Sequence, residues 1–295
     1  MRTDRRGFLQ AGATLAASSL IPAEAKSAPA VVAPKYKLSL AAYSMRQYLD
    51  LKNPKMKLEE FIEKCVEWGC DGTELTEYYF PKPITPEYLI RLKRTAIKAG
   101  LPITCTPIGN TFTLPPGEAR DKQIENMKKW IDVSAELGSP AIRTFAGGVP
   151  KGSTEEEARK WCVECLKISL DHAAKRGVFL ALENHGGIVA TAEGVLAILN
   201  EVKHDWLGVN LDSGNFHTPD PYADLEKIAP YAVTCQLKCE ISPKGGKKQD
   251  SDYGRVVEIM RKAGYRGFIT LEYEAAEEPT TGIPKHLEAI RKVLG

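Results

Sequence analysis

Acidic and amide side chains end several apolar segments in the second half of the chain. The clearest is 178–187, Val-Phe-Leu-Ala-Leu-Glu-Asn-His-Gly-Gly, in which an apolar run ends at Glu183. A near-continuous apolar run is typical of a buried parallel strand, and alternate side chains of a strand share one face. Glu183 and His185 are therefore expected to face the same way at the carboxyl end of a strand, where α/β proteins place their active sites.

The same pattern recurs in three later apolar segments, 206–212, 232–240 and 267–274. Each brings polar side chains to alternate positions near its carboxyl end, so that they are expected at one end of a common sheet. These residues are Asp212, Gln236, Lys238, Glu240, Glu272 and Glu274.

Carboxylates that point into one mouth would repel each other and would be costly to bury without partners. A divalent cation would remove both problems. The expected ligands are Glu183, Asp212, Gln236 and Glu272. A ring of salt bridges to Arg143 and Lys238, which are also expected to face inward, is the alternative. The spacing favours the cation over the ring.

The segments belong to an alternation of strands and helices that begins near residue 35. Strands are expected over 37–44, 72–76, 102–107, 140–146, 178–187, 206–212, 232–240 and 267–274. Helices are expected over 57–68, 86–99, 118–137, 153–176, 191–202, 221–229, 253–263 and 284–294. Eight such units without a G-x-G-x-x-G turn favour a closed (β/α)8 TIM barrel, formed as a single domain, over a doubly wound sheet.

Three motifs, Leu-Glu-Asn-His-Gly-Gly, Asn-Leu-Asp-Ser-Gly-Asn and Leu-Glu-Tyr-Glu, occur in this order from residue 182 to residue 274. Together they resemble the xylose-isomerase-like TIM-barrel superfamily of sugar isomerases and epimerases, over residues 37–294. The family binds its metal through Glu, Asp, His and Glu on strands five to eight. Glu183, Asp212 and Glu272 match this set, whereas Gln236 stands where histidine is usual. An amide oxygen can still bind a metal, and we expect Mn²⁺, Mg²⁺ or Co²⁺ rather than Zn²⁺, because oxygen ligands disfavour zinc.

The resemblance implies a metal-dependent isomerase or epimerase. Glu183 and Glu272 would lie on opposite faces of a keto-sugar, where one removes the proton next to the carbonyl and the other returns a proton. The metal would stabilise the enediolate charge. His185 would bind a hydroxyl or relay a proton, although a loop histidine fits the pattern nearly as well. Further candidates for substrate binding, each also consistent with a structural role, are Arg143, His217, Lys238 and Glu74.

Three other functions remain open. A lyase or hydratase acting on a keto-sugar or keto-glycoside would use the same base and metal. A non-catalytic sugar-binding protein would use the same pocket without proton transfer. A related barrel family cuts DNA with a histidine-rich zinc cluster, but only His185 and His217 of the five histidines are expected near the mouth. The formal net charge of +2 likewise gives no indication of a nucleic-acid partner.

The N-terminus has the organisation of an export signal. Arg5-Arg6-Gly7-Phe8-Leu9 precedes a short apolar stretch and Ala23-Glu24-Ala25, an A-x-A cleavage pattern. This order resembles the twin-arginine (Tat) signal, so residues 1–25 are interpreted as a Tat signal peptide, 26–36 as a linker and 37–295 as the barrel. The mature protein is expected in the periplasm or outside the cell, where sugar phosphates are rare. We therefore expect an unphosphorylated sugar as substrate.

The bulk composition is that of an ordinary globular protein, with 43% hydrophobic residues in 295. The apolar stretch of the signal is too short to span a membrane, and no span is expected in the mature chain, which could form a homo-oligomer. The seven cysteines are interpreted as core residues, including the pair Cys162 and Cys165 in a helical pattern.

Overall fold

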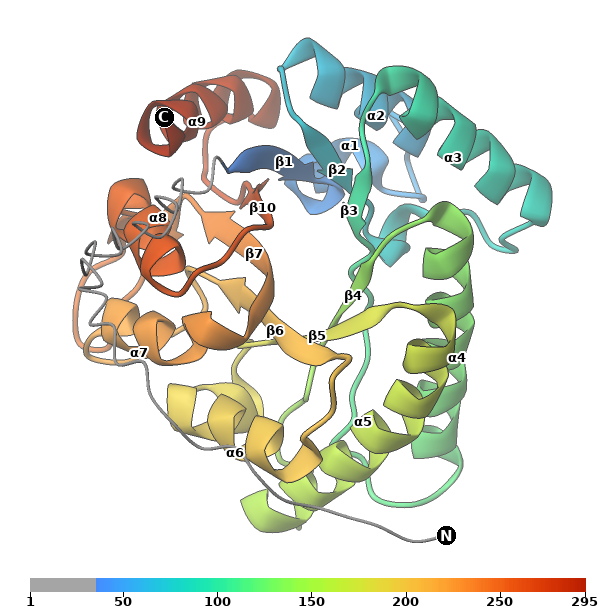
Figure 1. Ribbon diagram of the computed structural model, residues 1–295, viewed down its shortest axis with the longest axis vertical. Helices are drawn as coiled ribbons and strands as arrows, with labels where there is room; N and C mark the ends of the chain where they lie inside the picture. The colour runs from blue at the N-terminus through green and yellow to red at the C-terminus, as the bar shows by residue number, and fades with distance from the viewer. Residues whose placement is uncertain (1–35) are drawn as a thin grey trace, which may run out of the picture. The chain divides into compact units, whose positions relative to one another are not determined.

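Eight parallel strands form the centre of the molecule in a computed structural model that describes residues 36–295. Figure 1 shows them surrounded by helices. The strands are β1 (Lys37–Ala41), β2 (Gly72–Glu74), β3 (Ile103–Cys105), β4 (Ala141–Thr144), β5 (Phe179–Glu183), β6 (Leu207–Asp212), β7 (Ala232–Lys238) and β10 (Phe268–Glu272). The predicted signal peptide, and all but the last residue of the predicted linker, lie outside the described residues.

Closure of the barrel depends on the segment that follows β3. The strands pair in the order β3-β2-β1-β10-β7-β6-β5-β4. The amide nitrogen of Thr106 then lies 3.0 Å from the carbonyl oxygen of Ala141, and that of Ile108 lies 3.2 Å from the oxygen of Arg143. These bonds join the two ends of the sheet, so the predicted (β/α)8 architecture is confirmed.

The helices cover the outside of the strands (Figure 1). They are α1 (Arg46–Leu49), α2 (Leu58–Glu67), α3 (Pro86–Ala99), α4 (Glu118–Leu137), α5 (Glu155–Arg176), α6 (Ala192–Val202), α7 (Pro221–Ile228), α8 (Tyr253–Lys262) and α9 (Pro279–Leu294). The start of α5 follows from its sequence, because Thr154 and Glu157 form a capping box that satisfies free amide groups of the first turn.

Several predicted boundaries were wrong. Residues 42–45 form a 3-10 helix rather than the end of the first strand. Glu240 lies outside β7, in a small antiparallel hairpin of β8 (Glu240–Ile241) and β9 (Gln249–Asp250). The last helix begins at Pro279 rather than at 284, because the carbonyl of Glu278 accepts bonds from Thr281 and Gly282 and closes an earlier turn.

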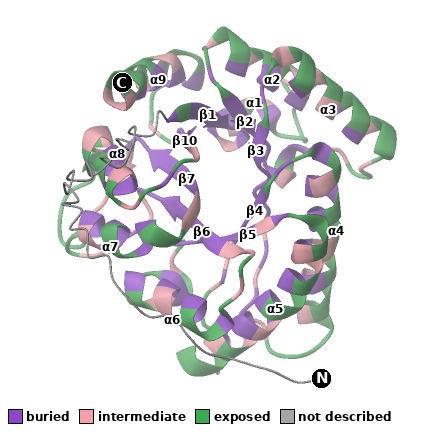
Figure 2. Cartoon of the chain, viewed as in Figure 1, coloured by how far each residue is buried: buried purple, intermediate pink, exposed green. Residues whose placement is uncertain are grey.

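Most residues of the barrel strands are buried, and Figure 2 shows most of each strand and the inner faces of the helices as buried. All seven cysteines lie in the described part of the chain, and all are buried and unpaired. Their interpretation as core residues is confirmed. Tyr36, the last residue of the predicted linker, is also buried, with its ring stacked on Tyr265.

Within residues 36–295, no helix is both long enough and apolar enough to cross a membrane.

Candidate active site

A cavity of about 420 Å³ opens at the carboxyl ends of the barrel strands. Five residues predicted from the sequence to take part in the site line it together, although they come from four different strands and one loop. The cavity is lined by Tyr43, Tyr78, Arg143, Phe145, Glu183, His185, Asn215, Lys238, Glu272 and Glu274. A volume of this size suits a small organic ligand.

The register of the parallel strands brings the polar side chains to one level. Glu272 pairs with Lys238 across β10 and β7, and Asp212 pairs with Gln236 across β6 and β7. Glu183, the last residue of β5, stands opposite Asn210 of β6. Glu183, Asp212, Lys238 and Glu272 end their strands, so their side chains meet at the rim of the barrel, as the sequence predicts. Asn210 and Gln236 lie two residues before the ends of β6 and β7, deeper in the barrel.

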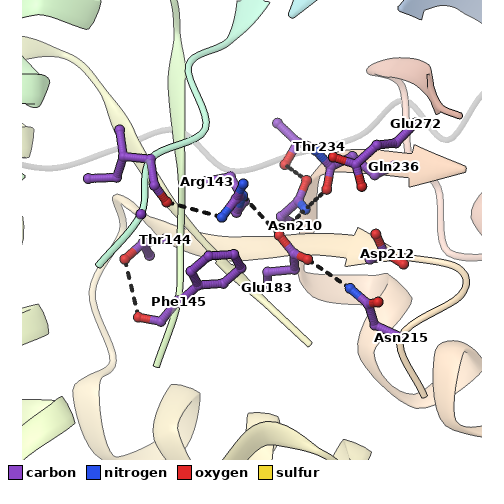
Figure 3. A network of polar contacts seen from close by, with 12 residues as sticks. Arg143, Thr144, Phe145, Glu183, Asn210, Asp212, Asn215, Thr234, Gln236 and Glu272 are labelled. Atoms are coloured by element: carbon purple, nitrogen blue, oxygen red, sulfur yellow. Dashed lines mark hydrogen bonds and ion pairs between the residues drawn. The ribbon is translucent and has the colours of Figure 1, made fainter. Parts of the chain in front are cut away.

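Glu183 is held by three partners, shown in Figure 3. Its Oε1 accepts a hydrogen bond of 2.8 Å from the Asn215 amide. Its Oε2 accepts a bond of 3.3 Å from Asn210 and lies 3.0 Å from Nε of Arg143. Burial outweighs the attraction of Arg143 and raises the pKa of Glu183 to about 7. This carboxyl group can therefore gain or lose a proton near neutral pH.

Gln236 uses both ends of its amide inside the barrel. Its Oε1 accepts from Asn210 at 2.7 Å, and its Nε2 donates to Glu74 at 2.7 Å. Asn210 in turn accepts from Thr234 at 2.7 Å. Burial, with the charge of Glu272 adding to it, raises the pKa of Glu74 to about 8. Glu74 was expected to bind substrate, but it is 1% exposed and lies behind Gln236, outside the cavity lining.

Asp212 is fixed by neighbouring backbone and side-chain groups. Its backbone N–H donates to Oδ1 of Asn184, and its backbone carbonyl accepts from Nδ2 of Asn184, each at 2.9 Å. Its side-chain Oδ1 accepts from the Gly214 N–H at 2.8 Å. The other oxygen, Oδ2, is buried without a hydrogen-bond donor. Burial raises the pKa of Asp212 to about 7. A fully buried carboxylate oxygen without a donor is costly unless a cation compensates it.

Lys238 supplies a positive charge in the middle of these acids. Its ammonium group contacts the carboxylates of Glu272 and Glu274 and lies 3.6 Å from Oδ2 of Asp212. Burial opposes its charge, but the three carboxylates together raise the pKa of Lys238 well above its usual value. Burial likewise opposes the charge of Glu272, yet Lys238 holds the pKa of Glu272 below its usual value. Glu272 is thus ionised at neutral pH.

The chemistry of the predicted metal ligands fits a hard divalent cation, because all four donors are oxygens and Oδ2 of Asp212 lacks a partner. As the side chains lie, however, two of the donor groups share Lys238 and the other two share the Asn210 amide. In the described residues, no three histidine, cysteine or acidic side chains lie close enough together to hold a metal. The structure thus has the salt bridges of the alternative interpretation, and the metal-ligand set stays a prediction.

The two candidate histidines lie in different places. His185 stands at the mouth of the cavity, with its ring centroid 4.4 Å from that of Phe145. Partial desolvation and the charge of Arg143 lower its pKa, so the ring is neutral at pH 7. His217 lines a smaller adjacent cavity of about 180 Å³. Its Nδ1 lies 3.0 Å from the carbonyl oxygen of Ser242, and since a carbonyl only accepts, Nδ1 is the donor of this hydrogen bond.

Sequence reasoning missed the aromatic wall of the cavity and the amides behind it. Tyr43, Tyr78 and Phe145 line the cavity, and the Arg143 guanidinium lies 3.9 Å from the Phe145 ring centroid. Aromatic residues after strands resemble core residues, so nothing in the sequence marked them. Asn210 did carry a signal, because it interrupts an apolar strand two residues before Asp212.

The loop after Glu183 is held against the loop after β4 by a glycine. Gly187 has a φ of +55°, and a Cβ there would collide with the backbone oxygen of Gly147. That oxygen also accepts a bond of 3.2 Å from the Ile188 N–H. We expect Gly187→Ala to lower the free energy of unfolding, measured in urea, by about 1–3 kcal/mol from backbone strain alone.

The matched control is Gly148→Ala. Gly148 is exposed, and a Cβ there would meet no atom within 4 Å. Equal stability of the two variants would show that the Gly187 contact does not hold the loop.

The chain matches a known family and one curated protein. Residues 62–293 match the family described as "Xylose isomerase-like TIM barrel". A 3-dehydroshikimate dehydratase of Bacillus anthracis is 22% identical over 198 residues, which is 66% of this chain and 69% of that protein.

Two solved structures illustrate the likeness of fold. The 3-keto-D-glucoside 4-epimerase of E. coli superposes with a TM-score of 0.68 at 17% identity, over 88% of this chain and 100% of the other. A xylose isomerase-like TIM-barrel protein of Mycobacterium smegmatis, in complex with magnesium, gives a TM-score of 0.68 at 17% identity, over 88% of this chain and 96% of the other.

Proposed function

The chain belongs to the xylose isomerase-like TIM barrel family, and we propose that it is an isomerase or epimerase of an unphosphorylated sugar or keto-sugar. The observation that carries the proposal is the placement of two buried carboxylates, Glu183 and Glu272, at the ends of β5 and β10 in the lining of one cavity. Two proton-transfer groups on opposite sides of one carbon are suited to epimerisation next to a carbonyl, because one can remove the proton and the other can return it on the opposite face.

The two carboxylates differ in the way that such a reaction requires. Glu272 is ionised beside Lys238, whereas burial keeps the pKa of Glu183 near 7. Environments that separate the proton affinities of two acids are typical of an acid and base pair. In the proposed reaction one carboxylate takes the proton next to the carbonyl. The electron pair moves onto the carbonyl oxygen to form an enediolate. The other carboxyl group, in its protonated form, then delivers its proton to the carbon from the opposite face as the electron pair returns from the oxygen.

Positive charge near the carbonyl oxygen would stabilise the enediolate. Arg143 and Lys238 both line the cavity and supply it. Glu183, Asp212, Gln236 and Glu272 are the residues that would hold a divalent cation, for which we expect Mn²⁺, Mg²⁺ or Co²⁺. When bound, such an ion polarises a carbonyl.

The rest of the lining suits an uncharged, hydroxyl-rich ring. Tyr43, Tyr78 and Phe145 offer aromatic faces to the apolar side of a sugar, and the neutral His185 can bond a hydroxyl. The two cations of the lining already face carboxylates, so a phosphate would have to compete with Glu183 and Glu272 for them. These features support an unphosphorylated substrate.

A lyase or dehydratase is the second candidate, and the likeness to a 3-dehydroshikimate dehydratase favours it. The first step is the same removal of a proton next to a carbonyl. The electron pair then expels a hydroxyl group from the neighbouring carbon as water, with a carboxyl group as the acid. Only the second step separates the two functions.

Product analysis tests the proposal. The full chain would be incubated with free ketohexoses and 3-keto-glucosides in the presence of Mn²⁺, Mg²⁺ or Co²⁺, and the products identified by NMR and mass spectrometry. We expect an epimer or isomer of unchanged mass. A product lighter by one water would establish the dehydratase, and binding without any product would leave only a sugar-binding protein.

Export by the Tat route is a further part of the proposal, and it predicts a periplasmic or secreted enzyme. Replacing Arg5 and Arg6 together by lysine is expected to keep the protein in the cytoplasm, measured by fractionation of cells that produce it. The control Arg2→Lys lies outside the pair and should be exported normally. Export of the double variant would refute the twin-arginine assignment.

A further inference from the structure

Lys238 occupies a position that a bound cation would need. Its ammonium group contacts Glu272 and lies near Oδ2 of Asp212, which has no hydrogen-bond donor. These two side chains are half of the predicted metal-ligand set. We propose that Lys238 is an internal counter-ion of the carboxylate cluster, and that a divalent cation binds by displacing its ammonium group from between Asp212 and Glu272. This inference rests on the metal dependence included in the proposed function.

The backbone of Lys238 is held in place, so only its side chain is free to move. Its N–H donates a bond of 2.8 Å to Oγ of Ser213, and its residue is the last of β7. Gly214 packs against the side-chain stem, and a Cβ at Gly214 would lie 2.6 Å from Cγ of Lys238 and 2.8 Å from its Cβ. The first part of the side chain is therefore fixed and directs the ammonium group toward the acids. Rotation about the last carbon–carbon bonds determines which carboxylates the ammonium group contacts.

The lysine compensates the cluster incompletely. At 3.6 Å, its nitrogen is too far from Oδ2 of Asp212 for a hydrogen bond, and this oxygen is fully buried without another donor. A divalent ion bound directly to Asp212 and Glu272 would satisfy both groups. It could not share them with Lys238, because two cations at such short range repel strongly in a buried site.

Glu274 gives the displaced ammonium group a place to go. It already contacts Lys238, and its side chain is 39% exposed at the mouth, where it lines the cavity. Lys238 can keep this contact while it leaves Asp212 and Glu272. Exchange with the cation would thus move the lysine from a counter-ion inside the cluster to a donor that faces substrate oxygens.

The test measures Mn²⁺ binding to the full chain, without substrate. After removal of metals with EDTA, Mn²⁺ would be titrated by calorimetry into the wild type and into Lys238→Met, which keeps an unbranched apolar stem of similar length and removes the ammonium group. The variant is expected to bind Mn²⁺ at least about tenfold more tightly, because the competing cation is gone. Its melting temperature without metal should fall, and Mn²⁺ should raise it by more than in the wild type.

Two further variants serve as controls. Lys292→Met removes an exposed lysine that pairs with Glu288 at 2.8 Å within α9, outside the lining of both cavities, and should bind Mn²⁺ as the wild type does. Lys238→Arg keeps the charge and should bind Mn²⁺ no more tightly than the wild type; tighter binding would contradict the exchange. This variant also keeps the proposal testable if Lys238→Met folds poorly.

Unchanged or weaker Mn²⁺ binding by Lys238→Met would overturn the exchange. So would the absence of Mn²⁺ binding in all variants, which would make Lys238 a permanent part of the site. Because no sugar is present, the result does not depend on whether the proposed epimerisation is correct. The exchange of Lys238 for a cation can therefore be wrong while the epimerase function is right, and the reverse also holds.

Discussion

Glu183→Gln is expected to lower kcat/KM by about 10²–10⁴-fold while the protein remains folded. The loss follows from the removal of a group that accepts or donates a proton at the reacting carbon. The fold should survive because the pKa of Glu183 is already near 7. Its neutral form is therefore close in free energy to its ionised form at neutral pH, and glutamine has the same shape. Steady-state kinetics and circular dichroism measure the two effects.

Glu74→Gln is the matched control for this substitution. Glu74 is as deeply buried as Glu183, but burial raises its pKa to about 8, and it contacts Gln236 rather than the cavity. Since it is already mostly neutral at pH 7, an amide should replace it with much less loss of activity. Full activity of Glu183→Gln, or an equal loss in both variants, would remove the special role of Glu183.

Glu272→Gln is expected to lower the rate of epimerisation by a similar factor. In D₂O, this variant is also expected to exchange hydrogen for deuterium in only one of the two epimers. With Glu272 replaced, only Glu183 can remove a proton, so one epimer should exchange its C–H for C–D without forming the other. In Glu183→Gln the opposite epimer should exchange. This reciprocal pattern follows only if the two carboxylates act on opposite faces of one carbon, and NMR detects it directly.

Exchange of the same epimer by both variants would place both carboxylates on one side of the substrate. Exchange of both epimers by either variant would show that a single group serves both faces. Each of these results would contradict a two-carboxylate mechanism even if both variants lost turnover.

The positions of the residues at the strand ends could be predicted because they follow from the geometry of a parallel barrel. In parallel strands of a closed barrel, a polar residue at the end of an apolar run points to the common mouth, whatever its distance in sequence. Glu183 and Glu272 were predicted in this way, and both line the cavity. The length and spacing of the apolar runs likewise predicted the eight barrel strands, and α4 was predicted with its exact bounds.

Side-chain partners were not predictable, because they depend on contacts between strands that are distant in sequence. Glu74 bonds Gln236 across 162 residues, and nothing near either residue indicates the pairing. The position of Lys238 among three acids depends in the same way on the register of β7 against β6 and β10. Glu240 lies outside β7 for a local reason, because it pairs with Asp250 in the hairpin of β8 and β9.

Deuterium incorporation during turnover by the wild type tests the central claim most directly. The reaction would be run in D₂O with a keto-sugar that the enzyme converts, and the product examined by NMR at the carbon whose configuration changes. Proton transfer through Glu183 and Glu272 predicts deuterium at that carbon, because carboxyl groups exchange their protons with solvent. A converted product that carries only the original hydrogen there would contradict the account.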